Sequence, residues 1–133
     1  MSNAVNADTN EMAYYASNGV FTADGPSLDP TIPWSKTLRP GHVTPYVGCD
    51  KRLGDPRTFS ANKTCKGGAR TAVLIRSEET GGIGCFSIFN EQTRRAGSSW
   101  WNYDRTCSVH LPSGKARTGR ATQHEGAGWY TSF

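Results

Sequence analysis

Residues 71–111 read TAVLIRSEETGGIGCFSIFNEQTRRAGSSWWNYDRTCSVHL, and the expected fold follows from this stretch. In residues 101–111 the odd positions are mostly apolar, with Arg105 as the exception, and every even position is polar. A period of two is typical of a strand with one face in a core and the other in water. The two earlier runs, residues 71–76 and 83–89, are short, β-branched and aromatic, so they predict a buried hairpin.

The composition indicates one small domain with many loops. Hydrophobic residues make up 35% of the 133-residue chain, below the roughly 45–50% usual for globular domains, a figure that also counts Gly. With 15 Gly and 7 Pro residues, many turns are expected, and a thin core needs cross-links, a metal or a partner. We therefore expect a mainly β fold, a small antiparallel sheet or sandwich of about five to seven strands stapled by disulfides.

Four cysteines supply such cross-links. Cys49, Cys65, Cys85 and Cys107 are 16, 20 and 22 residues apart, with no Cys-x-x-Cys and no nearby His pair, so no zinc site is expected. Two disulfides are predicted and three connectivities are open. Cys85 can pair with Cys107 if both lie on neighbouring strands and face the same way, which leaves Cys49–Cys65. An even number of cysteines indicates an extracellular or virion-associated protein, and the alternative is four buried thiols in the cytosol.

Residues 1–46 predict an extended N-terminal arm, followed by a disulfide-stabilised β domain over residues 47–133. Five prolines after Gly25 argue against a long helix or a central strand, and only residues 11–16 offer a helical turn or strand before them. A solvated linker would not carry so many large apolar groups. These are Met12, Tyr14, Tyr15, Phe21, Ile32 and Trp34. The arm is therefore expected to pack on its own domain or on a neighbouring copy.

Charge is unevenly distributed along the chain. The net charge is +4, yet residues 1–35 hold four acidic side chains and no Lys or Arg. The remaining residues are strongly basic, which is compatible with an anionic partner such as RNA or a glycan. The side chains expected to bind such a partner are Arg94, Arg95 and Lys115. The alternative is an ordinary solvated basic surface.

Adjacent tryptophans offer a candidate binding platform. Neighbouring strand residues point to opposite faces, so Trp101 is expected in the core and Trp100 outside it. An exposed Trp among polar residues can stack on a sugar ring or a base. The alternative is that Trp100 lies under the arm, covered by Trp34 or by the prolines.

The C-terminal third also holds groups suited to acid–base chemistry. Glu125 and either His124 or His110 could act as general base and acid, with Arg117 or Arg120 stabilising a phosphate. Residues 119–123 (GRATQ) and 128–133 (GWYTSF) resemble the end of small bacterial guanyl-specific ribonucleases. Trp129 stands where that pattern has its catalytic histidine.

Three functions from different classes follow. We expect first a non-enzymatic binding or assembly protein, such as a subunit of an extracellular or viral structure, that self-associates through its N-terminal arm. The second is a secreted toxin or ribonuclease acting through the basic C-terminal loops, and the third is a glycan-binding module. No cofactor is predicted because no phosphate-binding loop or metal-ligand pattern is present. No apolar run approaches the length of a membrane span.

Overall fold

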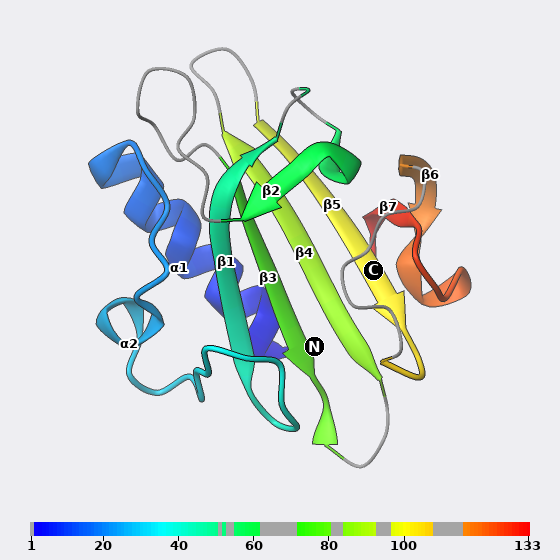
Figure 1. The fold of residues 1–133 in the computed structure, drawn as a ribbon, viewed down its shortest axis with the longest axis horizontal. Coiled ribbons are helices and arrows are strands. Elements are labelled where there is room, and N and C mark those ends of the chain that lie inside the picture. The colour runs from blue at the N-terminus through cyan, green and yellow to red at the C-terminus, as the bar shows by residue number, and fades with distance from the viewer. Residues whose placement is uncertain are drawn as a thin grey trace.

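The computed structural model describes residues 2–50, 52, 55–61, 72–80, 84–92, 97–107 and 116–133. A helix and a sheet form its two main layers (Figure 1). The helices are α1 (Ser2–Asn18) and the short α2 (Gly25–Leu28), with 3-10 turns at Pro56–Thr58 and Ala121–Gln123. The strands are β1 (Val43–Asp50), β2 (Phe59–Ala61), β3 (Ala72–Glu78), β4 (Cys85–Gln92), β5 (Gly97–Asp104), β6 (Ala116–Arg120) and β7 (Trp129–Ser132).

The strands that the structure describes form one sheet in the order β2-β1-β3-β4-β5-β7-β6. All neighbouring pairs are antiparallel except β6 and β7, which are parallel. The predicted hairpin is confirmed as β3 and β4, with Ile75 in register with Ile88. A mainly β fold is therefore confirmed, as a single mixed sheet.

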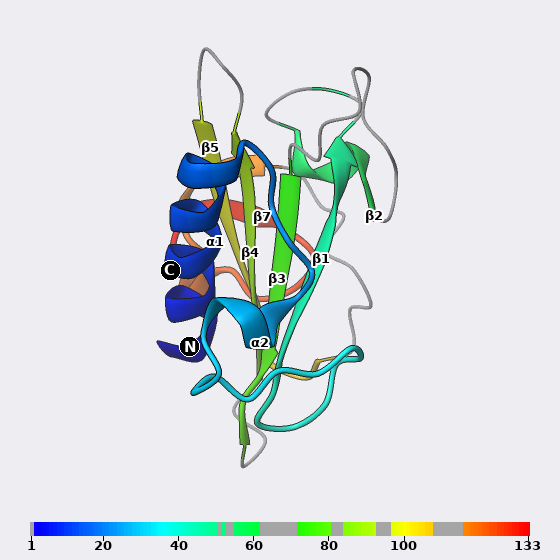
Figure 2. The same cartoon turned by 90° about the vertical axis from the view of Figure 1, so that its left-hand side faces the viewer.

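The predicted extended arm is wrong for residues 2–18, because these form α1. Figure 2 shows α1 as a layer covering one face of the sheet, which we call the helix face. Ala4 and Ala7 of α1 pack there with Phe21 and Ile32 of the following segment. They meet strand residues Val43, Val47, Val73, Ile75 and Ile88. The N-terminal segment therefore folds onto its own sheet.

Pro45 lies within β1, in register with Ile75, although the prolines were expected to exclude a central strand. The backbone of Val43 explains this, since its N–H donates to the Pro33 carbonyl and its carbonyl accepts from the Ser35 N–H. Alternate residues of β1 thus turn their backbone groups away from β3, and at Pro45 the missing N–H removes no bond to β3. β1 crosses the expected boundary between residues 46 and 47. The division of the chain into an arm and a domain stays a prediction.

The strand expected over residues 101–111 differs from the structure in two ways, in where it begins and ends and in which of its side chains are buried. β5 begins at Gly97 and ends at Asp104, and residues 108–111 lie outside the described part of the chain. Asn102 and Asp104, at even positions expected to face water, are buried. The reason is that side chains cover both faces of the sheet, with Leu74, Phe89 and Trp129 forming a second cluster opposite the helix face.

One predicted disulfide is confirmed. Cys85 opens β4, and Cys107 follows β5, its antiparallel neighbour, so the two Cα atoms come within 5.2 Å and the sulfur atoms are bonded. Cys107 adopts a left-handed backbone with φ of 55° as the chain turns away from β5. The Cys49–Cys65 pairing stays a prediction because Cys65 lies outside the described residues.

Candidate functional site

The side of α1 that faces away from the sheet carries no charged residue. We call it the outer face of α1, and its exposed residues are Val5, Asn6, Thr9, Ala13, Ala16, Ser17 and Asn18. Val5, with 36% of its surface exposed, is the one large hydrophobic residue classed as exposed among the described residues. Solvent-facing helix surfaces normally carry charged side chains, and the centres of protein interfaces are depleted of them.

Polar side chains along α1 already have hydrogen-bond partners in the helix itself. The Thr9 hydroxyl donates to the Val5 carbonyl at 3.0 Å, and the Asn10 amide donates to the Asn6 carbonyl at 2.9 Å. The Asn18 amide donates to the carbonyl one turn earlier, also at 2.9 Å. Removing water from this surface would therefore leave few hydrogen-bond donors without a partner, which lowers the free-energy cost of burying the surface against another protein.

The two charged residues of α1, Asp8 and Glu11, both point toward the sheet. Asp8 Oδ1 accepts a hydrogen bond from the Asn90 side chain of β4 at 3.1 Å. Glu11 is fully buried, and its Oε1 accepts from the Thr22 backbone N–H at 2.9 Å. Burial raises the pKa of Asp8 to about 6 and that of Glu11 to about 7. Sequence reasoning did not single out either residue as buried, because it placed both in an extended arm and not in a helix.

The face of the sheet opposite α1 holds a buried cation. Arg76 of β3 is 2% exposed, and its Nε donates to the Ser87 hydroxyl of β4 at 3.2 Å. Burial lowers the pKa of the Arg76 guanidinium, and the nearby charges of Asp104 and Glu78 oppose that shift. Asp104 and Glu78 come from strands at fixed register, so the sheet itself holds both carboxylates near the Arg76 guanidinium.

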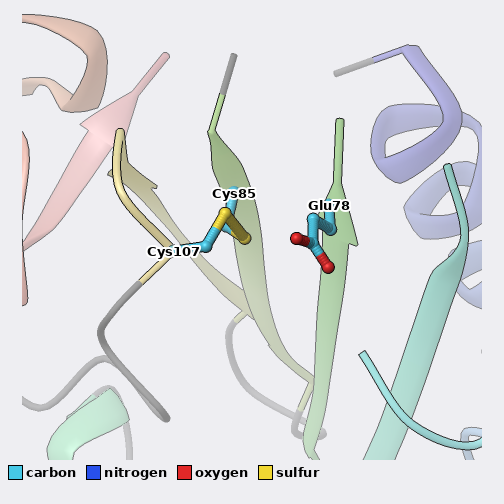
Figure 3. Close-up of side chains that lie close together, drawn as sticks. All are labelled: Glu78, Cys85 and Cys107. Carbon is cyan, nitrogen blue, oxygen red and sulfur yellow. A yellow bond between two sulfur atoms is a disulfide. The ribbon is translucent and has the colours of Figure 1, made fainter. Parts of the chain in front are cut away.

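Glu78 also lies beside the disulfide (Figure 3). Its carboxylate and the sulfur atoms of Cys85 and Cys107 lie within 4.8 Å of one another, a spacing that suits a metal ion. The two sulfurs are bonded to each other, however, and a metal is held by thiolates. The oxidised protein therefore offers only the carboxylate there. Glu78 and Cys107 line a cavity of about 480 Å³.

A larger groove of about 770 Å³ lies between the segment around α2 and the start of β1. Trp34 and Tyr46 form its aromatic walls, with Pro26 and Pro45, while Asp24 and Lys36 supply opposite charges. The Trp34 indole N–H is already used, since it donates to the Asp29 carbonyl at 2.8 Å. Sequence reasoning did not single out this groove, because its walls come from two segments that only the fold brings together.

Trp100 and Trp101 lie on opposite faces of β5, as predicted. Trp101 packs on the helix face, with its ring centroid 4.6 Å from that of Phe133. Trp100 is half-buried against the cluster of Leu74, Phe89 and Trp129. Trp34 does not cover Trp100, because Trp34 packs on the helix face, whereas Tyr46, the last residue of the expected arm, packs against the same cluster as Trp100. The use of Trp100 as a glycan platform stays a prediction.

The candidate acid–base residues are only partly described. Arg117 lies on β6, Arg120 ends it, and His124 and Glu125 follow the second 3-10 turn, all four being exposed. The His124 ring stacks on Tyr130 with centroids 4.7 Å apart. His110, Arg94, Arg95 and Lys115 lie outside the described residues. Neither cavity above is lined by any of the four described side chains, and the ribonuclease hypothesis stays a prediction.

Comparison with known proteins adds no relative. No protein-family model, no curated protein and no solved structure matches this chain. Among the described helices, none has the length and apolar composition needed to cross a bilayer.

Proposed function

We propose that this protein is a non-enzymatic assembly subunit whose copies associate through the outer face of α1. The observation that carries this proposal is the absence of charge on that face of a 17-residue helix, about 25 Å long at 1.5 Å per residue. The N-terminal region thus remains the proposed interface, as a docked helix and not as an extended arm. The Cys85–Cys107 disulfide favours an extracellular setting for the assembly.

A second copy of the chain is the proposed partner. Two identical uncharged faces can meet around a two-fold axis without like-charge repulsion, whereas a charged partner surface would leave its charges unpaired on this helix. The small side chains of Ala13, Ala16 and Ser17 let two helices approach closely. Elsewhere the net charge of +4 opposes random contacts between copies, which favours association at the neutral surface.

The test is the native mass of the full chain by light scattering. Ala13→Glu places one charge on the outer face at a position where Glu is a good helix former, so folding is retained. Thr118→Glu is the matched control, because it adds the same charge at an exposed position on β6. We expect the wild type and Thr118→Glu to form the same oligomer and Ala13→Glu to be monomeric. A monomeric wild type, or an equal effect of the two substitutions, contradicts the proposal.

A further inference from the structure

A pair of carboxyl groups lies under α1, and no cation among the described residues faces them. Asp8 and Glu11 are three residues apart and therefore share the side of the helix that packs on the sheet. Glu11 Oε2 is buried and has no hydrogen-bond partner, although Oε1 accepts from the Thr22 N–H. An ionised carboxylate in this position lacks the hydrogen bonds that would offset its lost hydration.

The surroundings of the pair supply polar and apolar groups but no described positive charge. β4 contributes Asn90 and Gln92, and the Tyr15 hydroxyl of α1 donates to the Gln92 carbonyl at 3.2 Å. Two further titratable groups are near this side: Tyr103 of β5, which shares the helix face with Trp101, and Asp29 after α2, which interacts with Asn10 of α1. β1, β3 and the segment after α1 contribute apolar side chains, namely Val43, Val47, Val73, Ile75 and Phe21. The charged residues of β3 and β4, Arg76 and Glu91 among them, alternate with Ile75 and Asn90 and so point to the opposite face.

We propose that this buried pair makes the docking of α1 on the sheet depend on protonation, so that α1 is held when both carboxyl groups are neutral and opens when they ionise. The inference concerns the inner side of the helix and does not rest on the proposed self-association. Its geometric basis is the unpartnered Glu11 oxygen, the second carboxyl group one turn away, and the lack of a described cation facing them.

The direction of the effect follows from linkage. Burial raises the pKa of Asp8 to about 6 and of Glu11 to about 7, and the neighbouring Asp8 charge adds to the shift at Glu11. Both folded values lie above the unfolded values of about 3.9 and 4.3 for Asp and Glu, so the docked helix binds more protons than the open one. The stabilisation of the docked helix that comes from burying both carboxyl groups in their neutral form is fully present below about pH 4, and it is lost as the pH rises to about 7.

The experiment is amide hydrogen exchange of dilute full-length protein between pH 5 and pH 8, expressed as protection factors corrected for the intrinsic exchange rate. For the wild type we expect protection in α1 to fall about tenfold or more across this range, while β3 and β4 lose less. Asp8→Asn with Glu11→Gln keeps the shapes of both side chains and removes their titration, so its α1 protection is expected to be flat. Asp24→Asn is the matched control, since Asp24 is exposed, and it should behave as the wild type.

Two outcomes would overturn the proposal. One is constant protection of α1 in the wild type, which would mean that the carboxyl groups keep one protonation state over this range. The other is an unchanged pH dependence in the double variant, which would place the titrating group elsewhere. Dilution keeps the chain below any self-association, so failure here and failure of the assembly proposal are distinguishable.

Discussion

Asn102 joins β5 to the segment before β7, because its side-chain amide donates to the carbonyls of Gly126 at 2.6 Å and Gly128 at 2.7 Å. These hydrogen bonds link residues 24 and 26 positions apart, and Asn102 is fully buried. The Asn102 side chain therefore helps to hold the C-terminal segment against the sheet, beside the backbone pairing of Trp101 with Tyr130.

Replacing Asn102 by Ala should lower the free energy of unfolding by about 1–3 kcal/mol, because two partly buried carbonyls lose their donor. Urea unfolding measures the change. Asn6→Ala is the control, since Asn6 is exposed on α1 and its replacement should change stability by less than about 0.5 kcal/mol. Equal effects at the two positions would mean that the Asn102 bonds contribute nothing net.

Gly25 is required by close packing against Trp34. A Cβ atom at Gly25 would lie 2.1 Å from Cδ2 of the indole, far inside contact distance. We expect Gly25→Ala to cost about 1–3 kcal/mol through overpacking and to displace Trp34, seen as a shift in Trp fluorescence. Gly19→Ala separates this cause from backbone strain, because Gly19 has φ of +71° but open space around it. A larger fluorescence shift for Gly19→Ala would contradict the steric explanation.

The disulfide between Cys85 and Cys107 cross-links positions separated by 22 residues. For a loop of that size the chain-entropy estimate is about 3 kcal/mol of stabilisation. The double replacement Cys85→Ser with Cys107→Ser should therefore lower the free energy of unfolding by about that amount in a urea titration. A thiol reductant should lower the free energy of unfolding of the wild type by more than that of the variant, because the variant has no Cys85–Cys107 bond to lose.

The sequence predicts the β3–β4 hairpin well, because short β-branched runs are a local signal. It leaves three disulfide connectivities open, and the structure selects the one that pairs Cys85 with Cys107 on neighbouring strands. Sequence reasoning fails for α1, although residues 4, 7, 8, 11, 12 and 15 follow helical spacing. Four of these six positions hold alanine or a carboxyl group, and only Met12 and Tyr15 are bulky and apolar, so the helical pattern is weak. The burial of Asn102 and Asp104 could not be predicted either, because the sheet face opposite α1 is covered by segments that are distant in sequence.

The buried Arg76 should stabilise the fold because its positive charge lies near the carboxylates of Asp104 and Glu78. Arg76→Gln leaves the Asp104 and Glu78 carboxylates without the cation that faces them, so we expect a loss of about 3–5 kcal/mol in the free energy of unfolding at neutral pH.

Ser87→Ala is the matched control for Arg76→Gln. It removes the hydroxyl that accepts from Arg76 Nε but keeps the charge, so it should cost only about 1 kcal/mol. Urea unfolding at pH 7 measures both losses, and Arg76→Gln is expected to cost clearly more than Ser87→Ala because only Arg76→Gln removes the charge. If the two substitutions cost the same, the hydrogen bond to Ser87 and not the charge of Arg76 accounts for its contribution.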